Sequence, residues 1–119
     1  MTHTSNPVSE DASEQVRIRR LVQKARGGDE DAFGELVKTY HQRVYSLAYG
    51  LSGRADDAHE IAQQTWIKAW QKLSSFKEDA GFFTWVYRVA SNTGLDYLRR
   101  RARRREEELP AGGEWPVDA

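Results

Sequence analysis

Six arginines lie within seven residues toward the C-terminal end of the chain: Arg99, Arg100, Arg101, Arg103, Arg104 and Arg105. One or two cations suffice to complement the dipole at the end of a helix. Six cations so close together repel one another unless a polyanion screens them. The run therefore favours binding to a phosphate backbone, and the alternative interpretation is a solvated helix end.

Aromatic side chains stand just before the arginines, at Phe76, Phe82, Phe83, Trp85 and Tyr87. Neighbouring residues of a helix point about 100° apart, so one helix face cannot bury all of them. Phe82 is the better candidate for the core, and others must lie at the surface. Exposed aromatic rings beside cations are typical of single-stranded nucleic-acid binding, in which bases stack on rings and phosphates meet cations.

Two polar residues of the same region, Asn92 and Asp96, have the spacing of one helix face. An amide beside a carboxylate can read both donors and acceptors of a base edge. Phe76 is expected in a loop, as a stacking platform with Lys77 beside it for phosphate. Gly94 would let a strand approach closely. In the alternative interpretation, Asn92 bonds a helix carbonyl and Phe76 plugs the end of the bundle.

Reactive groups for catalysis or metal binding do not converge anywhere in the sequence. His3, His41 and His59 are isolated, and there is no HExxH motif or serine nucleophile elbow. Asp56 and Asp57 are better explained as a helix cap than as catalytic carboxylates. The absence of cysteine excludes disulfides and thiolate metal sites. We therefore expect no catalytic residues, no metal, no cofactor and no enzymatic activity.

The composition bounds the class of protein. The 119 residues, 39% of them hydrophobic, suit one modest domain, and no apolar run is long enough to span a membrane. No secretory signal is evident, so a cytoplasmic location is expected. The formal net charge is zero, yet residues 84–105 carry seven basic and one acidic residue, while both ends are acidic. This segregation predicts a localised basic surface.

Helical periodicity runs through most of the chain, so we predict an all-α bundle of three long helices and a short N-terminal one. The short helix is expected over 14–26, with Val16 among its apolar positions. Asp29 is expected to cap the next helix, which ends at Gly53 and carries an apolar stripe that includes Tyr40. A third helix should start near Asp56, with an apolar stripe through Ile61, Trp66 and Trp70, and a last one should run from Phe82 to beyond Arg100. The predicted organisation is a disordered segment 1–13, a helical domain 14–105 and an acidic linker 106–119.

Three segments in unbroken order resemble the extracytoplasmic-function (ECF) subgroup of the sigma-70 family. Residues 32–45 resemble its region 2.1, residues 57–70 its region 2.2, and residues 83–100 its regions 2.3 and 2.4. The resemblance spans roughly residues 25–105 and rests on three linked motifs. It covers domain 2 only: a helix-turn-helix domain 4 for the −35 element is absent from these 119 residues. His59 and Gln64 depart from the family, which often carries acidic residues at those positions.

The resemblance implies a promoter-recognition module that binds the β′ clamp helices of core RNA polymerase and melts the −10 element of promoter DNA. By position, the polymerase-binding residues would be Asp57, Glu60, Gln63 and Gln64. The residues around the non-template single strand would be Phe76, Lys77, Phe83, Trp85, Arg88, Asn92 and Asp96, with Arg99, Arg100 and Arg103 on phosphates. An anti-sigma factor is a further candidate partner, and no membrane contact is expected.

Two other functions remain open from the sequence. The first is a generic helical nucleic-acid-binding module without a polymerase partner, which explains the arginines. The second is a protein-interaction bundle that does not bind DNA. Binding to core polymerase separates all three.

Overall fold

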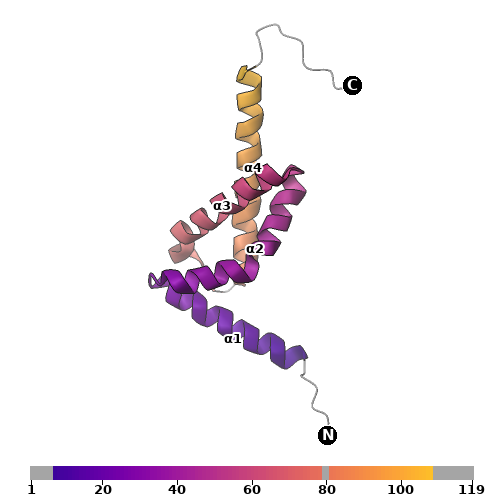
Figure 1. Cartoon of the computed structure of the whole chain (residues 1–119). Coiled ribbons are helices and arrows are strands. Elements are labelled where there is room, and N and C mark those ends of the chain that lie inside the picture. Colours follow the sequence, from indigo (N-terminus) through magenta and orange to yellow (C-terminus); the bar gives the residue numbers. More distant parts are fainter. Residues whose placement is uncertain (1–6, 79–80, 109–119) are drawn as a thin grey trace.

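The computed structural model describes residues 7–78 and 81–108, which form four α-helices and one short 3-10 turn (Figure 1). The predicted all-α fold class is confirmed. The elements are α1 (Pro7–Arg26), α2 (Glu30–Ser52), α3 (Ala55–Lys72), η1 (Leu73–Ser75) and α4 (Phe82–Glu108).

The ends of α2 follow the capping signals of the sequence. The Asp29 carboxylate accepts a hydrogen bond from the Ala32 N–H at 3.0 Å. At the other end Gly53 has a φ of 71°, and its N–H donates to the Tyr49 carbonyl at 2.7 Å. Glycine adopts this left-handed conformation without a steric penalty, so it ends the helix. Both predicted boundaries are confirmed.

Helix α1 is longer than predicted. It begins at Pro7 and has 20 residues against 18 in α3, so it is not a short leading helix. The prediction of disorder over 1–13 is wrong for 7–13, and residues 1–6 lie outside the described part. Proline is well suited to the first helical position, where its missing N–H needs no partner.

The inner face of α1 also differs from the prediction. Ile18, Val22 and Ala25 are buried, and Val16, expected on that face, is 51% exposed. Positions 18, 22 and 25 have the spacing of one helix face. Val16 lies outside that row.

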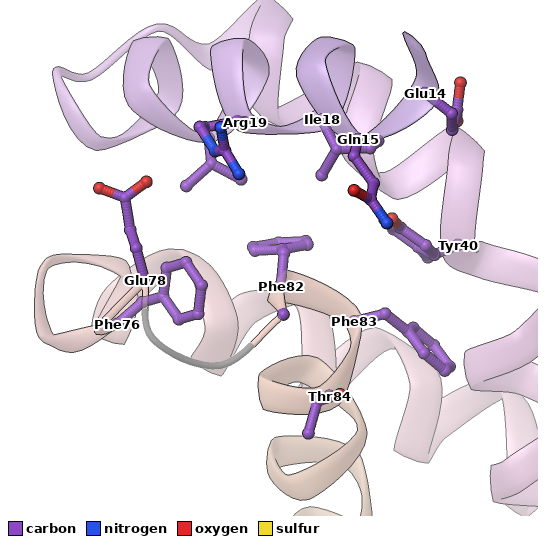
Figure 2. Close-up of a pocket in the computed structure, with 12 residues that line it drawn as sticks. Glu14, Gln15, Ile18, Arg19, Tyr40, Phe76, Glu78, Phe82, Phe83 and Thr84 are labelled. Atoms are coloured by element: carbon purple, nitrogen blue, oxygen red, sulfur yellow. The ribbon is translucent and has the colours of Figure 1, made fainter. Parts of the chain in front are cut away.

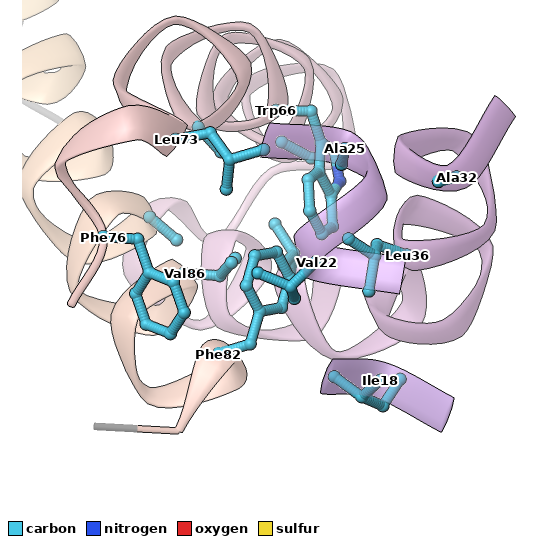
Figure 3. Close-up of a cluster of buried hydrophobic side chains, with 14 residues drawn as sticks. Ile18, Val22, Ala25, Ala32, Leu36, Trp66, Leu73, Phe76, Phe82 and Val86 are labelled. Atoms are coloured by element: carbon cyan, nitrogen blue, oxygen red, sulfur yellow. The ribbon is translucent and has the colours of Figure 1, made fainter. Parts of the chain in front are cut away.

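The main core lies where α1, α2, α3 and the start of α4 meet (Figure 3). Leu36 of α2, Ala62 of α3 and Val86 of α4 are fully or almost fully buried. Trp66 of α3 packs against Phe33 with an edge-to-face geometry and a centroid distance of 6.0 Å. The predicted apolar stripe of α3 therefore lies in the core through Ala62, Trp66 and Ala69, whereas Trp70, predicted on the same stripe, is 36% exposed.

Helix α4 is longer than the part of it that packs in the bundle. The molecule measures 73 × 37 × 23 Å, and the end of α4 extends beyond α2 and α3 (Figure 1). Residues 102–108 are all exposed. Among the helices described, none has the length and apolar character to cross a membrane.

Candidate nucleic-acid interface

The first aromatic group of the site is internal. Phe76 is only 4% exposed, and its ring packs edge-to-face on Phe82, with centroids 5.7 Å apart. Trp85 is half-buried, and its ring centroid lies 5.3 Å from that of Phe76. The N–H of Phe76 donates to the Leu73 carbonyl, and the ring lies within the core cluster (Figure 3). The prediction that Phe76 is an exposed platform for a base is therefore wrong, while the core position of Phe82 is confirmed.

A second aromatic group lies nearer the surface, between α2 and α4. Phe83 stacks on Tyr40 with a centroid distance of 5.2 Å and an interplanar angle of 21°. The Arg43 guanidinium lies 5.3 Å from the centre of the Phe83 ring. Tyr87, 47% exposed, meets Phe83 at 6.0 Å. We call Tyr40, Arg43, Phe83 and Tyr87 the aromatic platform.

Sequence reasoning missed the α2 half of the aromatic platform. Tyr40 was assigned to an apolar stripe, and Arg43 was not singled out. Their spacing of three residues places them on one helix face, which was the available signal. The contact with Phe83, forty or more positions away, depends on how α2 packs on α4. The pKa of Tyr40 is raised, mainly by burial of its hydroxyl and further by the negative charge of Glu14. The positive charges of Arg43 and Arg17 act in the opposite direction and lower it.

A groove of about 360 Å³ separates α1 from the start of α4 (Figure 2). Phe82 and Phe83 form its α4 side, and Tyr40 closes one end. Gln15 and Arg19 line it from α1. The groove offers planar apolar walls with polar groups at the rim, which suits a flat ring with polar edges.

The outer face of α4 carries a row of functional candidates, which we call the outer row. At spacings of three and four it holds Trp85, Arg88, Asn92, Asp96, Arg99 and Arg103. The row spans about 27 Å at the ~1.5 Å rise per residue of a helix. Arg88, Asn92, Arg99 and Arg103 are exposed, and so is Lys77 in the preceding loop.

Within the outer row, the acidic member is paired. Asp96 forms an ion pair with Arg100, one turn onward, at 2.8 Å. Asn92 is exposed, and no hydrogen bond from its amide to a helix carbonyl is present within residues 81–108. Six of the ten predicted DNA-binding residues thus share one face of α4. Phe83 lies on another side, against α2, Phe76 is buried against Trp85, and Lys77 and Arg100 lie outside the row.

Gly94 lies on the inner side of α4, away from the outer row. A β-carbon there would stand 2.8 Å from Leu51 Cδ1 and 3.4 Å from Ile61 Cγ2. The missing side chain therefore serves helix packing. The prediction that Gly94 lets a nucleic-acid strand approach is wrong.

Asp57 is buried in the contact between α3 and α4. It is 6% exposed and accepts hydrogen bonds from the Tyr97 hydroxyl, at 2.9 Å, and from the Arg101 guanidinium. The Arg54 Nε lies 3.8 Å away. Burial, the hydrogen bond to Asp57 and the Asp57 charge, in that order, raise the pKa of Tyr97. The prediction that Asp57 faces a partner protein is wrong. Arg54 occupies the N-cap position without a side-chain bond, so the predicted cap role of Asp56 and Asp57 is also wrong.

The outward face of α3 holds the other predicted protein-binding residues. Glu60 and Gln63 are exposed, and Gln64 is half-buried. The Gln64 amide donates to the Glu60 carboxylate at 3.1 Å. His59 is exposed and its ring lies 4.8 Å from that of Tyr45. Residues 7–78 and 81–108 hold no group of three or more His, Asp or Glu side chains placed to bind a metal.

Comparison with known families gives one model match, to Sigma-70 region 2, over residues 36–104. The ECF RNA polymerase sigma-E factor of Escherichia coli K12 is 42% identical over 94 residues, covering 77% of this chain and 48% of that protein. The ECF RNA polymerase sigma factor SigW of Bacillus subtilis is 33% identical over 87 residues, which cover 73% of this chain and 46% of that protein. The chain spans about half the length of these relatives.

Two solved structures are also similar. One is an engineered region 2 of sigmaE in complex with GTAAAA, with a TM-score of 0.69 and 37% identity over 73% of this chain and 90% of that one. The other is CnrH in complex with the cytosolic domain of CnrY, with a TM-score of 0.63 and 30% identity over 81% and 68%.

Proposed function

The chain belongs to the sigma-70 region 2 family, in its ECF subgroup, and from this premise we propose that it is a promoter-recognition module. It binds core RNA polymerase through α3 and recognises and melts the −10 element through α4. Its place of action is the cytoplasm, where the polymerase works. It carries out no catalysis of its own.

The single observation that carries the proposal is that α4 presents the outer row on one face and Phe83 and Tyr87 of the aromatic platform on another side, toward α2. Melting a duplex requires groups that hold an unstacked base and groups that hold the backbone. The aromatic platform offers an exposed ring, Tyr87, next to a stacked pair and a cation. Arg88, Arg99 and Arg103 of the outer row are exposed for phosphates, and Asn92 for a base edge. The sigmaE region 2 bound to GTAAAA supports this assignment.

The outward face of α3 supports the polymerase contact. Glu60, Gln63 and Gln64 form a polar face whose rear is fixed by the buried Trp66. The β′ clamp helices are the proposed partner. CnrH was solved with a second protein, the cytosolic domain of CnrY. That complex supports an anti-sigma factor as a further partner for this chain.

The test measures two bindings of the 119-residue chain. Fluorescence anisotropy with labelled GTAAAA should show tighter binding than with a strand of the same length and scrambled bases. A pull-down with a β′ clamp fragment should retain the chain. Equal affinity for both strands, with no clamp binding, would identify a generic nucleic-acid module and overturn the proposal. Binding to neither probe would identify a protein-interaction bundle.

A further inference from the structure

We propose that Asp57 is a positioning residue that holds the C-terminal part of α4 in the orientation that presents its arginines to DNA phosphates. We call residues 95–108 the arginine arm. The inference rests on the proposed function for the phosphate contacts. The anchoring of the arm does not depend on the proposed function, because it follows from the contacts of Asp57 in the structure.

The arginine arm is a poor helix by itself. An isolated helix of this length is marginal in water. Like charges four residues apart destabilise it, and they recur in the pairs Arg99–Arg103, Arg100–Arg104 and Arg101–Arg105. Three glutamates at 106–108 also lie at the negative end of the helix dipole. The arm therefore needs support from the bundle.

That support converges on one carboxylate of α3. Tyr97 and Arg101, one turn apart on the inner side of α4, both donate to Asp57, each to a different oxygen. Arg54 approaches from the chain before α3. A buried carboxylate with several donors is a strong tie, because each donor removed leaves a buried group without its partner. Beyond Arg101, every residue to 108 is exposed. Asp57 is thus the last tertiary anchor along the described part of α4.

Val86, Ala90 and Gly94, buried on the inner side of α4, set the rotation of the helix about its axis, and the anchor holds the arginine arm in that rotation. Arg101 points inward to Asp57, so Arg99 and Arg103, on the opposite side, point outward in the outer row. Glu60 lies one turn after Asp57 on α3. The same carboxylate therefore fixes the arginine arm relative to the face proposed to meet the polymerase. Without the anchor, the arginines are present but not held in position.

The test compares two aspartates next to each other. Asp57→Asn keeps the shape but leaves only one accepting oxygen for the two donors, Tyr97 and Arg101, and puts an N–H₂ group in place of the other. Asp56→Asn removes the same charge from an exposed position. Added positive charge by itself strengthens DNA binding. We expect Asp56→Asn to bind an oligothymidylate strand at least as well as the unmodified chain. Asp57→Asn should bind more weakly, and the slope of log K against log salt should be flatter by about 0.7 for each phosphate that the arm no longer binds.

Dependence on the arginines gives a second readout. Replacing Arg99 and Arg103 by Gln should flatten the same slope, and adding Asp57→Asn to that variant should change it little further, because both act on the same phosphate contacts. Additive effects would overturn the inference. If the slope of log K against log salt does not change when Arg99 and Arg103 are replaced, the phosphate contacts in the proposed function would be overturned instead.

Amide hydrogen exchange without DNA isolates the anchor. In Asp57→Asn, amides at 102–108 should exchange several-fold faster while core amides of α2 and α3 stay protected; Asp56→Asn should match the unmodified chain. Unchanged exchange at 102–108 would overturn the inference. If Asp57→Asn does not fold, Tyr97→Phe removes one donor without changing charge. It should give a smaller change in the same direction, and no change would also overturn it.

Discussion

Gly94 of α4 lies against Leu51 near the end of α2: a β-carbon at position 94 would stand 2.8 Å from Leu51 Cδ1. Ile61 of α3, fully buried, closes the site at 3.4 Å. The three helices therefore pack tightly at a position where α4 has no side chain. This close approach brings the next turn of α4 within reach of Asp57.

Substitution of Gly94 tests this packing. Gly94→Ala gains about 1 kcal/mol of helix propensity, and the flexible end of Leu51 can move aside, so the free energy of unfolding should change by about 1 kcal/mol at most. Gly94→Val adds branches against the buried Ile61 and should cost about 1–3 kcal/mol. Urea unfolding measures both. Equal stability of the Ala and Val variants would show that the site has spare room.

Charge reversal at Glu60 tests the face of α3 that is proposed to bind the polymerase. Glu60→Arg should weaken binding to the β′ clamp fragment by about 1–3 kcal/mol if the partner is basic. The fold should be unaffected, since the side chain is exposed and its carboxylate accepts a hydrogen bond from Gln64, which is one turn away on the same helix. Pull-down affinity and helicity by circular dichroism are the measurements. Glu30→Arg on α2 makes the same change of charge at another exposed position, so it is a matched control and should bind normally. Full affinity in Glu60→Arg removes this face from the proposed interface.

Asn92 tests base reading. Asn92→Ala should lower affinity for GTAAAA and reduce its advantage over a scrambled strand, because the amide supplies directed hydrogen bonds to a base edge. The melting temperature should stay nearly constant, as the side chain is exposed. Ser91→Ala, one residue away, is the control. Unfolding of Asn92→Ala, with normal discrimination in the folded fraction, would assign the residue a structural role.

Three aromatic substitutions separate stacking from packing. Phe76→Ala should destabilise the fold by about 3–5 kcal/mol, because it empties a core position. Tyr87→Ala removes an exposed ring of the aromatic platform and should weaken all single strands alike, by about 1–3 kcal/mol. Phe83→Leu, which keeps bulk beside Tyr40, should weaken binding with a smaller loss of stability. Thermal unfolding and anisotropy distinguish the cases; normal DNA affinity in both Tyr87→Ala and Phe83→Leu would contradict the platform assignment.

Tyr97 gives a pH dependence with a defined sign. Its pKa in the folded chain lies above the ordinary value of 10.0, so its protonated form is favoured by folding. Its contribution to stability is therefore complete below pH 10 and is lost as pH rises through the higher, folded-state pKa. The stability difference between the unmodified chain and Tyr97→Phe should shrink between neutral pH and about pH 11. A constant difference over this range would contradict a raised pKa of Tyr97 in the folded chain, which burial and the hydrogen bond to Asp57 cause.

The helical segments and both ends of α2 were predictable because they depend on residues that are close in the sequence. Spacings of three and four decide which residues share a helix face, so the stripe through Ile61 and Trp66 marked the core side of α3. Asp29 begins α2 by accepting a hydrogen bond from the Ala32 N–H, and Gly53 ends it by adopting a positive φ. Both effects involve residues within about one turn along the chain. The outer row of α4 was likewise implicit in the spacing of Arg88, Asn92 and Asp96.

The sequence by itself therefore determined the helical segments, the clustering of positive charge and the family to which the chain belongs. Tertiary packing alone decided the roles of Phe76, Asp57 and Gly94. Each of them looked exposed or accessible from its neighbours. Phe76 is covered by α4, Asp57 by Tyr97 forty positions later, and Gly94 by side chains of α2 and α3. Periodicity records which way a side chain points, whereas burial depends on which distant helix lies in that direction.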